Sequence, residues 1–130
     1  MRTYLVDGSN MVRRGAYDPR FPEVEEARTD GILSRLGGLA RQLGSSVRIE
    51  IFFDGPRRPT YPVEPPLFIR FPPGGNADDA ILGAARAVLA KGRGVIAVTA
   101  DGGLARDLES EGARVISFSE FEERLRSGRA

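Results

Sequence analysis

Short apolar runs alternate with helical patterns along the whole chain of 130 residues. Five runs rich in β-branched and aromatic residues predict strands over 3–6, 47–53, 67–71, 94–99 and 114–118. Most of these runs are almost continuously apolar, which is typical of strands that are buried on both faces. The alternation therefore predicts an α/β fold: a three-layer α/β/α domain around a mainly parallel sheet of about five strands.

Helical patterns fill the intervals between these strands. Apolar residues recur every three to four positions in 33–43 and 77–91, and a shorter helix is expected over 104–112. A glycine that can end a helix stands at the close of each pattern. Residues 13–31 read as irregular, with part of 22–28 compatible with a helix. Residues 55–66 contain several prolines and predict a surface loop.

A last helix is expected after the fifth strand. Ser119 and Glu122 have the spacing of a capping box, in which the two side chains satisfy backbone N–H groups at the start of a helix. In that register Phe121 and Leu125 face inward.

The composition limits the chemistry that this chain can perform. Its length fits one domain over residues 1–130. The chain contains no cysteine and no histidine, so disulfides, thiolate metal sites and histidine-based catalysis are excluded. No apolar run approaches the roughly 18 residues of a membrane span, and no signal-peptide pattern opens the chain. A soluble, cytoplasmic protein with no membrane partner is expected.

Aspartate follows three of the five predicted strands: Asp7, Asp54 and Asp101. In an open parallel sheet the carboxyl ends of the strands lie along one edge, where ligands bind. Asp78 and Asp79 open a predicted helix, and a helix that follows a strand begins at that same edge. The sequence therefore predicts a shared acidic site built from four separate segments.

Each of these aspartates also has a simpler interpretation. Asp7, Asp54 and Asp101 all precede glycine, and Asp-Gly is a common turn pair. Asp78 and Asp79 are acidic residues in a first helical turn, where they favour the helix dipole. The recurrence of aspartate at every position favours the shared site, because Asn, Ser or Thr would serve equally well in turns and caps.

Carboxylates held this close together repel one another and require protons or a cation. A donor set of oxygens without His or Cys favours Mg²⁺ or Mn²⁺, and such ions commonly meet phosphate. Basic loops flank the acidic edge, with Arg13 and Arg14 after the first strand and Arg57 and Arg58 after the second. An acidic, metal-binding pocket surrounded by arginine suits a polyanion such as RNA.

Four motifs give this sequence a resemblance to the YacP-like NYN-domain ribonucleases of the PIN-like nuclease superfamily. They are YLVDGSNMV at 4–12, IFFDG at 51–55, GGNADDAIL at 74–82 and VTADGGLARDL at 98–108. The motifs span nearly the whole chain in the expected order. The resemblance implies a PIN-like parallel sheet and metal-dependent endonucleolytic cleavage of RNA.

The resemblance also implies roles for individual residues. The catalytic carboxylates would be Asp7, Asp54, Asp78 and Asp101, and the metal ligands Asp7, Asp78, Asp79 and Asp101. Asn10 would orient the site or contact substrate, and the Ser9 and Thr99 hydroxyls would support the ligands. The positions of the basic loops, independently of the resemblance, add Arg13, Arg14, Arg57 and Arg58 as expected substrate contacts. Attack by water would leave 5′-phosphate and 3′-hydroxyl ends. RNA is the expected partner, and a ribosome is a further candidate.

Three other interpretations compete with a nuclease. A non-catalytic RNA- or ribosome-binding module could share the fold, although unneutralised carboxylates repel phosphate. A signalling receiver domain needs a lysine after its last strand, whereas Lys91 ends a predicted helix. Phosphoryl transfer of the haloacid-dehalogenase type needs a second aspartate two residues after the first, where Ser9 stands.

Overall fold

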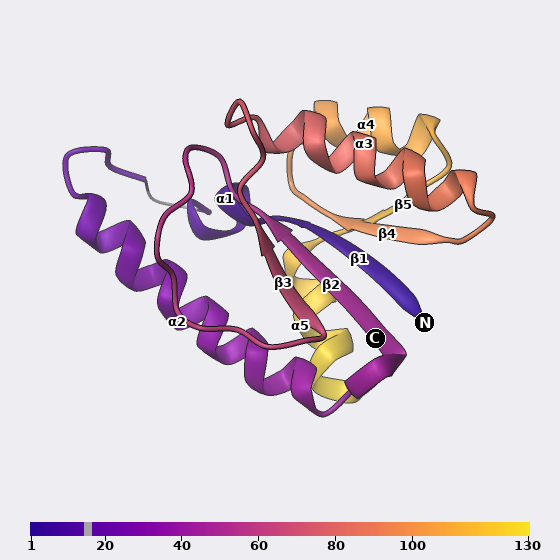
Figure 1. The fold of residues 1–130 in the computed structure, drawn as a ribbon, viewed down its shortest axis with the longest axis horizontal. Helices are drawn as coiled ribbons and strands as arrows, with labels where there is room; N and C mark the ends of the chain where they lie inside the picture. Colours follow the sequence, from indigo (N-terminus) through magenta and orange to yellow (C-terminus); the bar gives the residue numbers. More distant parts are fainter. Residues whose placement is uncertain (15–16) are drawn as a thin grey trace.

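The computed structural model describes residues 1–14 and 17–130 (Figure 1). Its strands are β1 (Arg2–Asp7), β2 (Val47–Phe52), β3 (Leu67–Arg70), β4 (Val95–Val98) and β5 (Arg114–Ile116). They form one sheet in the order β3-β2-β1-β4-β5, and every neighbouring pair is parallel. The predicted parallel five-stranded sheet is therefore confirmed.

The strand order places β1 at the centre of the sheet. The chain runs outward from β1 through β2 to β3, then crosses to the other side of β1 to form β4 and β5. The order reverses between β1 and β4, and a crevice at the carboxyl ends of such strands is where ligands bind in open α/β sheets.

Helices cover both faces of the sheet, as predicted for three layers. They are α1 (Gly8–Val12), α2 (Pro22–Arg41), α3 (Ala77–Ala90), α4 (Gly102–Ser110) and α5 (Phe118–Ser127), with a 3₁₀ turn, η1 (Gly44–Ser46), before β2. Figure 1 shows α2 and α5 on one face and α3 and α4 on the other. Among the described residues, no helix is long and apolar enough to cross a membrane.

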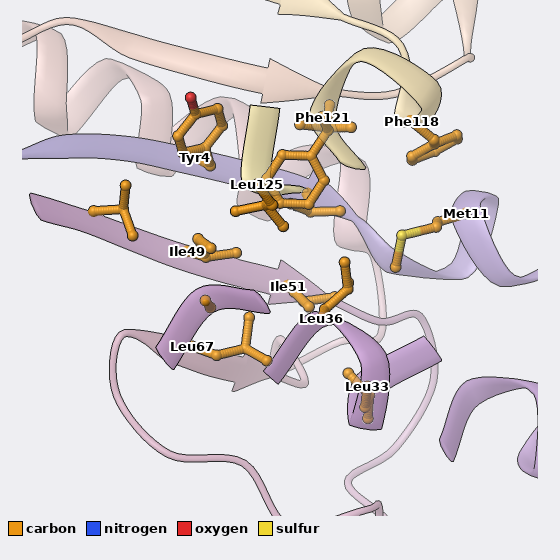
Figure 2. Packing of buried hydrophobic residues seen from close by; sticks show 14 of the residues in the cluster. Tyr4, Met11, Leu33, Leu36, Ile49, Ile51, Leu67, Phe118, Phe121 and Leu125 are labelled. Carbon is orange, nitrogen blue, oxygen red and sulfur yellow. The ribbon is translucent and has the colours of Figure 1, made fainter. Parts of the chain in front are cut away.

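Alternate residues of β1 point to opposite faces of the sheet. Tyr4 belongs to the core cluster under α2 and α5, where its ring lies 5.2 Å from that of Phe121 (Figure 2). Leu5 belongs to the cluster under α3 and α4. The same alternation places Asp7 at the end of β1 on the α3 and α4 side.

The long helix α2 is more extensive than the sequence pattern indicated. It begins at Pro22, inside the stretch that read as irregular, and ends at Arg41, before the predicted end of the pattern. Proline is favoured in the first turn because its nitrogen carries no hydrogen to satisfy, and Glu23 and Glu25 there favour the helix dipole. Gly44, with φ of 54°, begins η1.

The start of α5 differs from the prediction by two residues. The strand before it ends at Ile116, and Ser117 caps the helix by accepting a hydrogen bond from the N–H of Glu120 at 3.0 Å. Both Ser117 and Ser119 are followed three residues later by glutamate, so spacing alone does not choose between them. The burial of Phe118 distinguishes the two serines, because Phe118 is 2 % exposed in the helix that Ser117 caps.

Replacing Ser117 with alanine is expected to lower the free energy of unfolding by about 1 kcal/mol, the usual cost of losing a helix cap. Ser119→Ala is the matched control and should change it by less than about 0.5 kcal/mol, because Ser119 is an exposed residue within the helix. Urea unfolding of both variants measures the difference. A larger loss for Ser119→Ala would mean that the helix begins two residues later.

Candidate functional site

The carboxyl edge of the sheet, formed by the carboxyl ends of its strands, gathers the predicted site residues. Asp7 ends β1 and is the N-cap of α1, and Asp101 follows β4 as the N-cap of α4. Asp54 lies two residues after β2. Asp78 and Asp79 stand in the first turn of α3. Strand ends and helix starts thus bring all five aspartates to the carboxyl edge of the sheet, as the parallel topology predicts.

Asp7 is the buried carboxylate of this group, with an exposed fraction of 4 %. Its Oδ1 accepts a hydrogen bond from the N–H of Asn10 at 3.3 Å, and its Oδ2 accepts one from the Thr99 hydroxyl at 3.0 Å. Burial raises the pKa of Asp7 to about 6. The two hydrogen bonds oppose this rise, and the negative charges of Asp78 and Asp54 add to it.

The raised pKa of Asp7 predicts a gain in stability on acidification. Its ordinary pKa is 3.8, so between pH 3.8 and about 6 the folded state binds a proton that the unfolded state does not. The free energy of unfolding should therefore rise as the pH falls through this window, by roughly 2–3 kcal/mol for metal-free protein. This contribution is complete below pH 3.8 and is lost as the pH rises through 6.

Urea unfolding in EDTA at several pH values measures this effect. Asp7→Asn is the reference, because its side chain does not titrate, and the difference between the two proteins isolates Asp7 from the other acids. A wild type that loses stability relative to Asp7→Asn on acidification would show that Asp7 is stabilised as a carboxylate.

Two buried hydroxyls link the segments of the site. The Thr99 hydroxyl donates to Asp7 and accepts a hydrogen bond from the N–H of Asp101 at 3.1 Å. The Ser9 hydroxyl accepts from the N–H of Asp54 at 2.8 Å. The end of β1 is thereby connected to the segments after β2 and β4. Both residues were predicted to support the carboxylates, and the structure places them beside Asp7, Asp54 and Asp101.

Asn10 makes a third link. Its side-chain oxygen accepts a hydrogen bond from the N–H of Ala100 at 3.1 Å. One predicted role of Asn10 was to orient the site, and this contact holds α1 against the β4–α4 connection. This hydrogen bond uses the side-chain oxygen of Asn10. Contact between the side-chain NH₂ group of Asn10 and a substrate stays a prediction.

The start of α3 is fastened to the end of β2. Oδ1 of Asp54 accepts a hydrogen bond from the N–H of Ala77 at 2.9 Å, and the N–H of Gly55 donates to the carbonyl of Gly75 at 3.2 Å. Asp78 follows directly and is exposed. Its pKa is raised, first by partial burial and then by the charges of Asp101, Asp54 and Asp79.

Two of the five aspartates cap helices, two lie in the first turn of α3, and charges within the group act on one another. Asp7 and Asp101 cap helices, as the simpler interpretation proposed, with Leu104 donating its N–H to Asp101 at 3.1 Å. Burial is the first cause that raises the pKa of Asp7 and of Asp78, and the charges of neighbouring aspartates add to it in both cases. The capping roles of Asp7 and Asp101 are therefore confirmed, and a shared site that binds a ligand stays a prediction.

An all-oxygen set of repelling carboxylates suits a hard divalent cation in its chemistry. Across residues 1–14 and 17–130, however, no three acidic side chains form a group already arranged to hold a metal ion. Several carboxylate oxygens are instead engaged by helix and loop N–H groups. The residue types fit the ion, and the side chains would have to draw closer together to bind it.

The four predicted substrate-binding arginines differ in how far they are already engaged. Arg13 forms an ion pair with Glu25, and Arg58 donates to the carbonyls of Asp54 and Pro56 at 2.9 and 3.1 Å. Arg14 is exposed, with its guanidinium 5.3 Å from the ring centre of Phe118, and Arg57 is exposed. Arg13 and Arg58 therefore hold the structure together, which leaves Arg14 and Arg57 accessible to a ligand.

Gly8 also belongs to this site, although no sequence pattern singled it out. A Cβ atom on Gly8 would lie 2.7 Å from Ile51 Cγ2, 2.8 Å from the carbonyl oxygen of Phe52 and 2.9 Å from Phe53 Cε1. Only a residue without a side chain lets the turn from β1 into α1 pass this close to β2. The available signal was the glycine placed directly after an aspartate that ends a buried strand.

This fold and this edge define a doubly wound α/β domain of the YacP-like type, with aspartates at the reversal point of its sheet. Two solved structures share the fold over nearly the whole chain, and both are of Rae1 (YacP) from Bacillus subtilis. One has a TM-score of 0.72 at 19 % identity and covers 98 % of this chain and 75 % of that chain. The other, a point mutant, has a TM-score of 0.66 at 20 % identity and covers 96 % and 74 %.

These likenesses confirm the YacP-like fold that the four motifs indicated. No protein-family model matches the chain, and no curated protein matches its sequence. At 19–20 % identity the likeness concerns the fold, and the activity has to be argued from the residues of the site.

Proposed function

We propose that this protein is a metal-dependent endoribonuclease that hydrolyses RNA phosphodiester bonds at the carboxyl edge of its sheet. The observation that supports this most directly is that aspartates from four segments lie at one edge of the sheet, where burial first, and then the charges of their neighbours, raise the pKa of Asp7 and Asp78. A cation that relieves this repulsion would bind where a phosphate could reach it. The YacP-like fold agrees with the ribonuclease resemblance of the motifs.

The proposed ligands of Mg²⁺ or Mn²⁺ are Asp7, Asp78 and Asp101, with Asp54 or Asp79 assisting. When bound, the ion would make water a usable nucleophile near neutral pH and stabilise negative charge on the phosphate. No histidine is needed for this chemistry.

The remaining polar groups of the site would hold these carboxylates in place. Thr99 and the N–H of Asn10 fix the two oxygens of Asp7, so that this carboxylate does not rotate freely. Ser9 fixes the backbone of Asp54, and the N–H of Ala77 fixes one of its carboxylate oxygens. These contacts restrict Asp7 and Asp54, and binding of an ion would still require the carboxylates of the different segments to draw closer together.

Cleavage of labelled RNA in Mg²⁺, Mn²⁺ or EDTA tests the proposal. We expect cutting only with metal, and products with 5′-phosphate and 3′-hydroxyl ends, because water is the nucleophile. Products with a 2′,3′-cyclic phosphate would show that the ribose hydroxyl attacks, and cutting in EDTA would show that no metal is required.

A non-catalytic RNA- or ribosome-binding module is the second candidate. The observation that favours it is that helix starts already occupy oxygens of Asp7, Asp54 and Asp101, while no three acids within the described residues are arranged to hold a metal. RNA binding that is equal with Mg²⁺ and EDTA, without cutting, would support the module over the enzyme.

A further inference from the structure

We infer that the phosphodiester backbone of a polynucleotide crosses the carboxyl edge between three arginines, Arg57, Arg14 and Arg106, and that Arg106 binds a phosphate. This inference rests on the proposed function for the identity of the polyanion. Arg106 is not among the arginines that the sequence indicated. Arg106 is identified by two features of the folded chain: it forms no ion pair among the described residues, and its side chain lies against the start of α4.

Most arginines of this protein are neutralised by an acidic partner, as Arg13 is by Glu25 and Arg35 is by Glu122. In the part of the chain that the structure describes, Arg14, Arg57 and Arg106 form no ion pair. All three side chains are exposed. An exposed guanidinium without an acidic partner keeps its full charge and its donors for a ligand.

Arg106 lies in α4, directly after the acidic site. Its Nη1 is 3.5 Å from the position that a Cβ atom would take on Gly102, the first residue of α4. The side chain therefore folds back along the helix toward its start, and Gly102 immediately follows Asp101. This places the guanidinium at the start of α4, next in sequence to Asp101, on the β4 side of the carboxyl edge.

Arg57 occupies the opposite side, in the loop after β2. Its position is fixed through its neighbour Arg58, which donates to the carbonyls of Asp54 and Pro56 and lies 4.9 Å from the ring centre of Phe71. The loop is also held to the start of α3 by the hydrogen bond from Gly55 to Gly75. The backbone of Arg57 is therefore held three residues after Asp54, and its side chain is exposed beside the loop that leads to β3.

Arg14 completes the set on the β5 side. Its guanidinium lies 5.3 Å from the ring centre of Phe118, the first residue of α5, which follows β5 at the same edge. In sheet order, Arg57 follows β2, Asp7 ends β1 and Arg106 follows β4. Arg14 lies against the helix after β5, on the face that α2 and α5 cover, whereas Asp7 lies on the α3 and α4 side. The ends of β2 and β5 are three strand spacings apart, about 14 Å, a distance that a few nucleotides span.

These arginines flank the aspartates without neutralising them. Among the described residues, no ion pair joins Arg14, Arg57 or Arg106 to any of these aspartates. Arginines whose role was to neutralise these aspartates would form ion pairs with them. Cations that surround the acids and leave them charged instead suit a ligand that carries negative charge on both sides of the reacting phosphate.

The test is the salt dependence of RNA binding by Arg14→Gln, Arg57→Gln and Arg106→Gln. Anisotropy of a labelled single-stranded RNA is followed from about 50 to 200 mM salt with Mg²⁺ present, in an Asp7→Asn background that keeps the RNA intact. Each substitution should weaken binding roughly three- to tenfold at low salt and reduce the slope of log K against log salt by about 0.7. Arg93→Gln is the control, since Arg93 is exposed, has no ion pair among the described residues, and precedes β4 at the opposite edge.

The outcomes separate this inference from the proposed activity. Smaller slopes for the three variants and an unchanged Arg93→Gln support it, even if wild-type protein cuts no RNA and the nuclease proposal fails. If wild-type protein cuts RNA but the three variants bind with wild-type slopes, the inference is overturned and the nuclease stands. An equal change in Arg93→Gln, or no RNA binding at all, also overturns it.

Discussion

Replacing Asp7 with asparagine is expected to reduce RNA cleavage more than about 100-fold. Loss of a residue that merely supports a metal ligand commonly costs 10–100-fold, so loss of the central proposed ligand should cost more. The same substitution should leave the fold intact, because asparagine has nearly the same shape and removes a buried charge whose pKa is raised to about 6. Activity and stability should therefore move in opposite directions.

Initial rates of cleavage in Mg²⁺ and urea unfolding in EDTA near pH 7 measure the two quantities. Asp107→Asn is the matched control, since Asp107 is an exposed acid on α4 whose side chain, within the described residues, makes no contact with the site. A wild-type rate in Asp7→Asn would remove Asp7 from the mechanism. A loss of rate that accompanied a loss of stability would point to a structural role instead.

Replacing Gly8 with alanine is expected to destabilise the protein by about 3 kcal/mol or more. The new methyl group would lie 2.8 Å from the carbonyl oxygen of Phe52, and a backbone atom inside a sheet cannot move aside as a flexible side chain can. Relief requires β1 and β2 to separate at the carboxyl edge. That separation would also break the link from Ser9 to Asp54.

Gly83→Ala is the control for this substitution. Gly83 lies inside α3 with no atom within 4 Å of the added carbon, so alanine there should stabilise the helix by about 0.5–1 kcal/mol. Thermal or urea unfolding compares the two variants with the wild type. A Gly8→Ala protein of wild-type stability would show that the β1–α1 turn is looser than its contacts indicate.

The sheet was readable from the sequence because each strand is a short apolar run bounded by breaks in the pattern. The order of the strands could not be predicted from the sequence. The central position of β1 depends on how the helical connections pack on the sheet, and no local run of residues determines that. The start of α5 shows the same limit at smaller scale. Ser117 and Ser119 carry the same spacing signal, and only the burial of Phe118 distinguishes them.

The acidic edge was predictable for a topological reason, because parallel strands bring their carboxyl ends together. The sequence did not predict which charged side chains form ion pairs and which stay exposed. Glu25 neutralises Arg13 because α2 begins at Pro22, in a stretch whose pattern read as irregular. Arg106 looked like one more charged residue of a helix, and its direction along α4 is visible only in three dimensions.

The two outermost strands carry a consequence for the behaviour of the protein in concentrated solution. An open sheet exposes unpaired backbone groups on β3 and β5, and such borders invite strands from other molecules to join. Here the borders measure four and three residues, and each includes an arginine, Arg70 or Arg114. Because these borders are so brief, they give an incoming strand few backbone groups to pair with, and we expect them to resist fibrous self-assembly.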